Sequence, residues 1–475
     1  MKNTEIILRE RFEGKKVVLL GAGVSNTPLA EFLSSFGASV EIRDKKDTSE
    51  LKSEVVEGFE KCGASFVTGE GYLDGISADY VFRSPGFRPD LPEINEAVKC
   101  GAVLTSEMDL FTELRPGTLI GVTGSDGKST TTTVIYEILK HAFSGTKREA
   151  YLGGNIGFPL LDRICSMTSD SVVSCELSSF QLMTVERAPD VAVITNISPN
   201  HLNWHVDMDE YIGAKARILR GASRAVLNFG CEITRRLGEG CDCPVTYFSK
   251  YPIHPDDIKE KDSFVCLDGE DIVKYDGRTG KTVKIMMLSD ILIPGLHNAE
   301  NYMAAIGATE GFASYDDVRA VARSFGGVKH RFELVRILNG VYYYNSSIDS
   351  SPTRTIAALS NLKDKPIDLI LGGSDKNIPY APLADAIAHH GNVRCVVVTG
   401  QSAPKILSSF DECPDFADSG VKVIRAGSFR EAVLTAASHA EEGDAVLLSP
   451  ASASFDSFPN FEVRGECFKE IVNSL

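Results

Sequence analysis

The 475-residue sequence contains no run of about 18 apolar residues, the minimum length for a membrane-spanning helix. Residues 1–13 are charged and hold no apolar segment, so we expect no signal peptide. The 11 cysteines lack the regular spacing of a disulfide framework. Cys241 and Cys243 form a C-x-C pair, but no second pair of ligands follows at zinc-site spacing. We therefore expect a reduced, cytoplasmic protein with no membrane insertion.

Basic residues are fewer than acidic ones. The sequence has 49 Lys and Arg against 65 Asp and Glu, which gives a net charge of -16. Nucleic acids and anionic membranes attract clustered Lys and Arg, so this balance argues against either as a partner. It does not exclude a small anionic substrate, because local backbone N–H groups and one or two cations suffice to bind a phosphate.

Short repeats and low-complexity tracts are absent, and short apolar runs alternate with helical patterns instead. This alternation predicts an α/β protein with parallel sheets. We expect three domains: an N-terminal Rossmann-like domain (1–107), a central domain (108–328) and a C-terminal Rossmann-like domain (329–475). The expected strands are 16–20, 40–44, 80–82, 118–122, 171–174, 191–195, 341–345, 368–371, 393–399 and 445–448. The expected helices include 28–36, 131–141 and 299–312.

A first glycine turn follows the expected strand 16–20. Gly21 and Gly23 are followed about twenty residues later by Asp44, which resembles a dinucleotide fingerprint. Asn26 stands where the third glycine would be. Asp44 could accept a hydrogen bond from a ribose hydroxyl or a base, but the same residues could form only a tight strand-to-helix turn. Alone, the segment is compatible with NAD, a nucleotide sugar or no ligand.

A second glycine turn lies between an expected strand and a helix and reads T-G-S-D-G-K-S-T over 123–130. The N–H groups and dipole at a helix start favour phosphate, which predicts a P-loop-type ATP-binding mononucleotide fold for the central domain. Lys128 would neutralise β- and γ-phosphate oxygens, and the Ser129 hydroxyl would reach Mg²⁺. Val122 replaces the first glycine of the general pattern, so this loop is a shorter form. The expected ATP-binding residues are Gly124, Ser125, Asp126, Gly127, Lys128, Ser129 and Thr130.

Further motifs follow in order along the chain, at 153–157, 176–182, 196–201, 214–217, 295–301 and 330–333. With the short phosphate loop, they make the sequence resemble the Mur ligase superfamily over essentially its whole length. The resemblance implies an ATP-dependent amide ligase of peptidoglycan precursor synthesis. In such an enzyme ATP phosphorylates a substrate carboxylate, and an amine then attacks the acyl phosphate.

The resemblance implies catalytic roles for Lys128, His201 and Lys215, and two Mg²⁺ sites held by Ser129, Glu176, His201 and Lys215. Lys215 would be carbamylated by CO₂, which requires a neutral amine and thus a pKa below the usual value of about 10.4. Two alternatives remain open: Glu176 could instead be a charge at a helix start, and Lys215 a solvated helix lysine.

The implied adenine ligands are Asn298 and Asn301, which lie three apart on one helix face, although Asn298 could merely cap that helix. Arg331, at the junction to the third domain, would reach the γ-phosphate when the domains close.

The stretch 448–468 is similar to that of family members that add D-glutamate to UDP-N-acetylmuramoyl-L-alanine. The Asn/Asp-Pro-Arg signature of diamino-acid ligases is absent, and a folate-polyglutamate ligase would lack the N-terminal block. We expect a monomer acting on these small-molecule substrates, with no nucleic-acid partner. The implied D-glutamate ligands are Lys376, Ser454 and Phe461. The implied ligands of the UDP-substrate are Gly23, Val24, Asp44, Lys45, Ser84 and Asn155.

Two departures from the family pattern leave other functions open. Ser346 and Ile348 replace an Asp and a Lys near the nucleotide, where Asp349 or Arg354 could take over their contacts. Asn200 and Asn203 replace two aspartates around His201. The alternatives are a Mur-type ligase for another amino acid, a non-catalytic nucleotide-binding paralogue, and a dehydrogenase that uses the first glycine turn.

Overall fold

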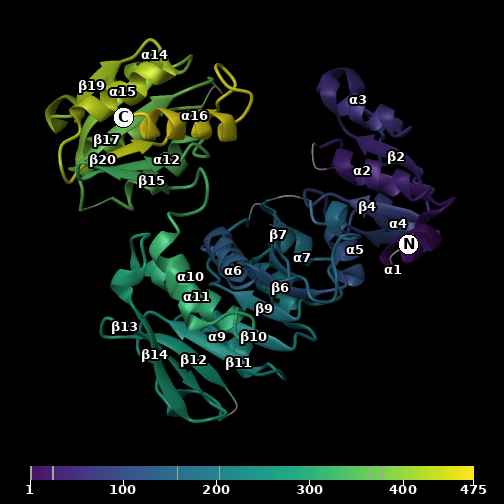
Figure 1. Cartoon of the computed structure of the whole chain (residues 1–475). Helices are drawn as coiled ribbons and strands as arrows, with labels where there is room; N and C mark the ends of the chain where they lie inside the picture. The colour runs from purple at the N-terminus through teal and green to yellow at the C-terminus, as the bar shows by residue number, and fades with distance from the viewer. Residues whose placement is uncertain are drawn as a thin grey trace. The chain divides into compact units, whose positions relative to one another are not determined.

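The structure is a computed structural model that describes residues 3–23, 26–157, 159–202, 204–260, 262–362, 364–375 and 378–475. The chain divides into two compact units, Met1–Ser324 and Phe325–Leu475 (Figure 1). The strands of the described residues form three sheets, two in the first unit and one in the second. No described helix combines the length and the apolar character that crossing a membrane requires.

The first sheet has the strand order β3-β2-β1-β4-β5, and its neighbouring strands are parallel. Its strands are β1 (Lys16–Leu20), β2 (Ser39–Asp44), β3 (Ser65–Thr68), β4 (Tyr80–Arg83) and β5 (Val103–Thr105). Its helices are α1 (Asn3–Phe12), α2 (Asn26–Ser35), η1 (Thr48–Glu50), α3 (Ser53–Lys61), α4 (Pro92–Lys99) and α5 (Glu107–Leu114). Since β1, β2 and β4 are parallel neighbours, the residues that follow them gather at one edge of the sheet.

The second sheet has the order β14-β13-β12-β11-β10-β9-β6-β8-β7, parallel from β7 to β12 and antiparallel beyond. Its strands are β6 (Thr118–Thr123), β7 (Ala150–Gly154), β8 (Val172–Glu176), β9 (Val191–Ile194), β10 (Arg224–Asn228), β11 (Val245–Ser249), β12 (Ser263–Asp268), β13 (Asp271–Asp276) and β14 (Lys281–Met287). Its helices are α6 (Lys128–Ala142), η2 (Leu161–Arg163), α7 (Ser179–Leu182), α8 (Met208–Ala216), η3 (Arg217–Leu219), α9 (Glu232–Glu239), η4 (Pro255–Asp257), η5 (Leu288–Asp290), α10 (Leu296–Ala308) and α11 (Tyr315–Ser324). Val122 pairs with Glu176, so the loop after β6 and the end of β8 share an edge.

The sheet of the second unit has the order β15-β16-β20-β17-β18-β19, with an antiparallel hairpin at β15-β16 and parallel pairs elsewhere. Its strands are β15 (Glu333–Leu338), β16 (Val341–Asn345), β17 (Ile367–Gly372), β18 (Val393–Thr399), β19 (Lys422–Arg425) and β20 (Ala445–Leu448). Its helices are α12 (Pro352–Leu359), α13 (Ala381–His390), α14 (Ala403–Asp411), η6 (Ala417–Ser419), α15 (Phe429–His439) and α16 (Phe461–Asn473).

The predicted α/β class is confirmed, and every expected strand begins and ends within two residues of its prediction. The helices predicted at 131–141 and 299–312 begin three residues earlier in the structure. Helix α6 follows the phosphate loop directly, and Gly295 is the N-cap of α10. The helices α1 and α16 were not predicted. The break between the compact units lies at 324/325, and the domain boundaries at 107/108 and 328/329 stay predictions.

The buried carboxylate of Asp368 in β17 lowers the stability of the second unit when it is ionised. Its side chain is fully buried, and neither carboxylate oxygen has a hydrogen-bond partner within the described part of the chain. The closest cation is Arg394, whose Nη2 lies 4.0 Å from Oδ2. Burial raises the pKa of Asp368 to about 6, and Arg394 offsets this only in part.

Asp368→Asn should therefore stabilise the second unit at pH 8. The unfolded carboxyl loses its proton near pH 3.9, whereas the folded one holds it up to about pH 6, so ionisation costs native stability as the pH rises through that window. Removing the charge should raise the free energy of unfolding by about 1–2 kcal/mol at pH 8 and by less at pH 5. Thermal unfolding at both pH values measures the difference.

The matched control is Asp444→Asn. Asp444 accepts a 2.9 Å contact from Arg394, so its loss should lower the unfolding temperature at pH 8. An Asp368→Asn protein that is less stable than the parent at pH 8 would contradict the assignment of a buried, costly charge.

Candidate active site

The phosphate loop is built by two glycines between β6 and α6. Gly127 is the N-cap of α6 with φ 78°, and Gly124 has φ 148°, conformations that side chains disfavour. A Cβ at Gly124 would collide with Thr195, and one at Gly127 would collide with Asn301. The packing of the loop against these two residues therefore requires glycine at both positions, and the backbone N–H groups at the start of α6 suit an anion.

Two lysines converge on the carbonyl of Gly124. Lys128 Nζ donates to the oxygens of Gly124 (2.9 Å) and Ser125 (2.8 Å). Lys215 Nζ donates to the same Gly124 oxygen (2.7 Å) and to Thr123 Oγ1 (3.3 Å). Lys215 is only 2% exposed, so it is not a solvated helix lysine. Burial, reinforced by the charge of Lys128, lowers the pKa of Lys215 to about 7.

Glu176 lies beside the phosphate loop, at the end of β8, and is 2% exposed. Its Oε1 accepts a hydrogen bond from Asn155 Nδ2 (2.9 Å), while Oε2 is buried with no hydrogen-bond partner among the described residues. The helix that follows begins at Ser179 with Ser178 as its N-cap, so the alternative of a helix-start charge is wrong. An unpartnered buried carboxylate oxygen suits a cation ligand.

His201 adopts an unusual backbone conformation, with φ 55°. Its ring contacts the Phe180 ring edge to face, with centroids 5.0 Å apart. Burial, with the charges of Lys128 and Lys215, lowers its pKa. The backbone N–H of His201 donates to Asn200 Oδ1 (2.8 Å), a bond that an aspartate would also accept. The exchange to Asn200 therefore removes a charge but keeps this contact. Asn203 lies outside the described residues.

Protein ligands for a metal are sparse around this loop. In the part of the chain that the structure describes, no three His, Cys, Asp or Glu side chains come together to hold an ion. Glu176 would thus depend on hydroxyl oxygens such as that of the buried Ser129, or on a modified Lys215, for further coordination.

Of the two asparagines of α10, Asn301 lies against Gly127 of the phosphate loop and Asn298 bonds to Asn301. Asn301 is buried, its Oδ1 accepts from Thr131 Oγ1 (3.1 Å), and its Nδ2 donates to Asn298 Oδ1 (3.2 Å). The N-cap of α10 is Gly295, and Asn298 Nδ2 donates to Pro294 O (2.6 Å). Asn298 is therefore not the N-cap, and the pair forms one amide array next to the loop.

The first glycine turn is held by Asp44 and Ser84. Asp44 Oδ2 accepts from the Ala22 backbone N–H (2.7 Å), and Oδ1 accepts from the N–H of Lys46 (2.8 Å). Ser84 Oγ donates to Leu20 O (2.6 Å). Both side chains thus shape the edge of the first sheet where a nucleotide is expected.

Asn26 explains the missing third glycine. Its Nδ2 donates to Gly21 O (2.7 Å) and to Ser84 Oγ (2.9 Å), so the side chain ties the ends of β1 and β4 together. Gly23 and Lys45 are exposed at this edge, and Val24 lies outside the described residues.

In the second unit, Arg464 organises the expected D-glutamate region. It is 1% exposed and donates to the backbone oxygens of Ser347 (2.8 Å), Ser452 (3.1 Å) and Ala453 (3.1 Å). Ser347 Oγ in turn donates to Phe461 O (2.8 Å). Burial lowers the pKa of Arg464 to about 10. The guanidinium therefore ties the loop after β20 to the start of α16.

These contacts place Ser454 and Phe461 in one region of the second unit. Ser454 is buried and Phe461 is half-buried at the start of α16. Lys376 lies outside the described residues, but the nearby Ser374 donates its backbone N–H to Ala453 O (2.8 Å).

Arg331 is exposed between two residues with left-handed backbone, His330 (φ 60°) and Phe332 (φ 48°). Glu333 Oε2 accepts from the His330 N–H (2.9 Å). Ser346 Oγ accepts from the Phe332 N–H (3.0 Å), so Ser346 keeps a structural role in place of the family aspartate.

Asp349 does not present its carboxylate to the solvent. It is 7% exposed, and its Oδ2 accepts from Ser449 Oγ (2.8 Å). Arg354 is exposed and donates to Ile348 O (3.1 Å). Of the two expected substitutes for the altered family residues, Arg354 is thus the one placed at the surface.

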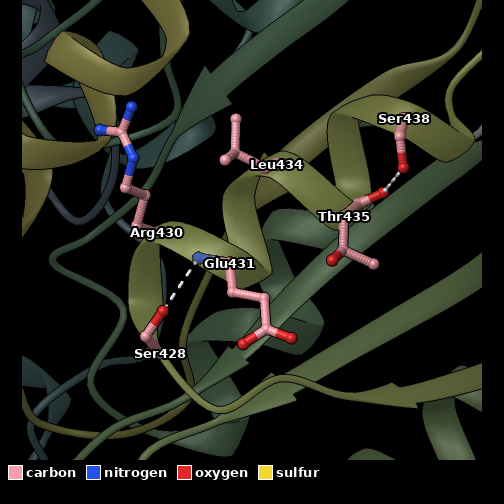
Figure 2. A pocket seen from close by; sticks show the side chains of 6 residues that line it. All are labelled: Ser428, Arg430, Glu431, Leu434, Thr435 and Ser438. Carbon is pink, nitrogen blue, oxygen red and sulfur yellow. Dashed lines mark hydrogen bonds between the residues drawn. The ribbon is translucent and has the colours of Figure 1, made fainter.

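A separate shallow hollow lies on the exposed face of α15 (Figure 2). In it, Ser428 Oγ accepts from the N–H of Glu431 (3.2 Å), and Ser438 Oγ donates to Thr435 O (2.8 Å). These are ordinary helix-capping and within-helix bonds. None of the predicted site residues lines this hollow.

Known proteins are similar to this chain over most of its length. The Mur ligase middle domain matches residues 122–309, and the Mur ligase, glutamate ligase domain matches residues 330–452. A UDP-N-acetylmuramoylalanine–D-glutamate ligase of Acetivibrio thermocellus is 47% identical, with 98% of each chain covered. The chain belongs to the Mur ligase family. A protein of the same name from Ruminiclostridium cellulolyticum is 44% identical, with 100% of both chains covered.

A solved Mur ligase shares the fold. The UDP-N-acetylmuramate-alanine ligase of Thermotoga maritima aligns with a TM-score of 0.54 at 19% identity, over 97% of this chain and 99% of that one. This likeness supports the predicted three-domain Mur ligase architecture.

Several buried side chains that hold the Mur ligase motifs in place were missed in the sequence. Tyr211 OH lies 2.9 Å from Ser125 Oγ of the phosphate loop, and Arg464 ties the two segments of the second unit. Arg464 and Tyr211 each lie within or near a recognised motif. Neither lies in an apolar run, so only its place in or near a motif could have pointed to it.

Proposed function

We propose that this Mur ligase joins D-glutamate to UDP-N-acetylmuramoyl-L-alanine with the energy of ATP. The observation that carries the proposal is the 47% and 44% identity, over essentially full length, to ligases named for this reaction. The phosphate loop with Lys128, Lys215 and Glu176 on one sheet edge supports it. The non-catalytic alternative is less favoured, because Ser346 and Asn200 keep hydrogen bonds that hold the site.

In the proposed reaction, an oxygen of the substrate carboxylate attacks the γ-phosphorus of ATP, and ADP leaves. The amine of D-glutamate then attacks the carbonyl carbon of the acyl phosphate, and inorganic phosphate leaves. The first step brings two anions together, so it needs concentrated positive charge. Lys128 and the N–H groups at the start of α6 would supply it.

Mg²⁺ would be held by Glu176, Ser129 and His201, where the buried free oxygen of Glu176 fits a cation. Bound there, the ion would offset the charges of phosphate and carboxylate. Lys215 would complete a second site as a carbamate. Its neutral Nζ would form an N–C bond with CO₂ and release a proton, which turns a cation into an anionic oxygen ligand.

The remaining assignments follow the sequence motifs. Asn298, Asn301 and Arg331 would bind ATP, as would the loop residues 124–130. The UDP-substrate ligands would be Gly23, Val24, Asp44, Lys45, Ser84 and Asn155. The D-glutamate ligands would be Lys376, Ser454 and Phe461. We expect a monomer, and the need for ATP and a nucleotide precursor would place it in the cytoplasm.

Phosphate release from ATP tests the proposed function. It should require Mg²⁺, UDP-N-acetylmuramoyl-L-alanine and D-glutamate together, and omission of any one should abolish it. L-glutamate, L-alanine and a diamino acid serve as controls for the amino-acid site. Release with one of these but not with D-glutamate would indicate another Mur-type specificity. ATP binding without release under any combination would indicate a non-catalytic paralogue, and a nicotinamide-dependent absorbance change a dehydrogenase.

A further inference from the structure

The loop that follows β4 contacts Trp204 and the start of helix α8, in the part of the chain that forms the second sheet. Arg88 Nη2 donates to Glu210 Oε1 (2.8 Å) and Nη1 to the backbone oxygen of Trp204 (3.0 Å). The guanidinium also lies 5.1 Å from the centre of the Trp204 ring. Trp204 Nε1 in turn donates to Gly86 O (3.4 Å). Gly86 belongs to the turn that begins at Ser84, a proposed ligand of the UDP-substrate.

His205 continues the chain of contacts inward. Its side chain is fully buried, with Nδ1 3.0 Å from Glu210 Oε2 and Nε2 2.9 Å from Ser179 Oγ. A carboxylate beside Nδ1 fixes the proton there, so Nε2 accepts from the Ser179 hydroxyl. Ser179 opens α7, three residues after Glu176. Three hydrogen bonds therefore link Arg88 to the segment that carries the proposed metal ligand.

Aromatic rings connect His205 to other proposed active-site residues. The Phe180 ring stacks on His205 (5.6 Å, 10°) and meets the His201 ring at 5.0 Å. The Tyr211 ring lies 5.2 Å from His205 and 4.7 Å from Lys215 Nζ. Every proposed catalytic side chain except Lys128 thus contacts a ring that packs on His205.

We propose that Arg88, Trp204, His205 and Glu210 form a coupling network by which the UDP-substrate turn positions the phosphoryl-transfer residues. The inference rests on the proposed function, since that function places the UDP-substrate at Ser84. In this network Arg88 and His205 are positioning residues that do not touch the reacting atoms. Occupancy of the turn acts on Gly86 and Trp204, and the rigid contacts of His205 transmit it to Glu176 and His201.

The geometry favours a positioning role of the network over a role in packing alone. Arg88 and Glu210 are 23% and 24% exposed, whereas an adhesive contact would bury apolar area instead. The guanidinium binds Asp90 and Glu210 at once, which fixes its plane. Hydrogen-bonded side-chain networks act as units, so loss of one member disturbs the others.

Trp204 provides a direct optical probe, because it is the only tryptophan in the sequence. Titration with UDP-N-acetylmuramoyl-L-alanine should change its fluorescence with a midpoint equal to the Kd from calorimetry. In Arg88→Ala the calorimetric binding should remain while the emission change is lost. A purely structural role of Arg88 would leave the emission change in place.

Steady-state kinetics test the effect on chemistry. His205→Asn keeps a donor for Glu210 but loses the bond to Ser179, and Glu210→Gln loses the charge that holds Arg88. Each should lower kcat by about 10- to 100-fold, with the KM for ATP changed by less than about twofold. Arg88→Lys keeps the charge but not the paired geometry, so its kcat should lie between those of Arg88→Ala and the parent.

The controls replace matched residues outside the network. Arg236→Ala removes an exposed pair with Glu232 on α9, and His141→Asn removes an exposed contact with Asp317. Both should keep the parental kcat and emission change. Arg88 and Glu210 are partly exposed, so their variants are expected to fold even if His205→Asn does not.

Two results would overturn the coupling network: parental kcat in both Arg88→Ala and Glu210→Gln, or calorimetric binding to the parent without any change in Trp204 emission. Absence of calorimetric binding and of turnover in the parent would instead overturn the proposed function, and the premise of the network with it.

Discussion

Replacing Lys128 with alanine is expected to lower kcat for D-glutamate addition by about 10³-fold. The KM for D-glutamate should change much less, because Lys128 lies on the phosphate loop and its Nζ contacts the loop carbonyls of Gly124 and Ser125. A cation at this place stabilises the negative charge that develops as the γ-phosphoryl group is transferred. Its loss therefore lowers kcat. Phosphate release with saturating substrates measures the effect.

Lys140→Ala is the matched control for Lys128→Ala. Lys140 lies on the same helix, α6, is exposed, and contacts Glu137 at 3.5 Å. It should keep the parental kcat and unfolding temperature. If Lys128→Ala joined the two substrates as fast as the parent, phosphoryl transfer at this loop would be ruled out.

Ten of the strands could be predicted, most of them buried on both faces, whereas exposed or half-buried strands such as β3, β14 and β19 were missed. Strands β1, β18 and β20 are almost continuous apolar runs, and the predicted bounds 16–20, 393–399 and 445–448 match the structure residue for residue. Such runs are typical of parallel strands covered by helices. The phosphate loop was also predictable, since a strand, a glycine turn and a helix are all local in sequence.

The polar interior could not be predicted in the same way. Arg464 is bonded to Ser347, 117 residues away, and Arg88 to Glu210, 122 residues away. No local pattern encodes such partners, since they depend on how distant segments pack. Asn26 shows the same limit: its place resembled a defect in a glycine motif, but its amide ties two strands.

Local alternatives were decided by where the helices begin. Glu176 and Asn298 each had a reading as a helix-start residue, and both readings fail because the N-caps are Ser178 and Gly295. Instead, Glu176 bonds to Asn155 and Asn298 bonds to Asn301. The ligand roles themselves stay proposals that follow from the family, supported by burial and by the free oxygen of Glu176.

Lys215→Ala is expected to lower kcat by at least about 10³-fold, because the variant loses the proposed carbamate ligand. Lys215→Arg should lower kcat by as much, since a guanidinium with a pKa above about 12 offers no neutral amine to CO₂. The pKa of Lys215 is about 7, so the neutral fraction rises through that pH. Both the carbamate and kcat should therefore increase from pH 6 to pH 8.

Chemical rescue separates a carbamate from a simple lysine cation. In Lys215→Ala the vacated space lies 2.7 Å from Gly124 O in the parent and next to Thr123, so a small carboxylate such as acetate can replace the missing oxygen ligand. Acetate should restore part of kcat in Lys215→Ala but not in Lys215→Arg, whose side chain fills the space. A ¹³C carbamate signal in the parent, absent from both variants, should accompany this pattern. Full activity of Lys215→Arg would show that charge alone is required and that no carbamate forms.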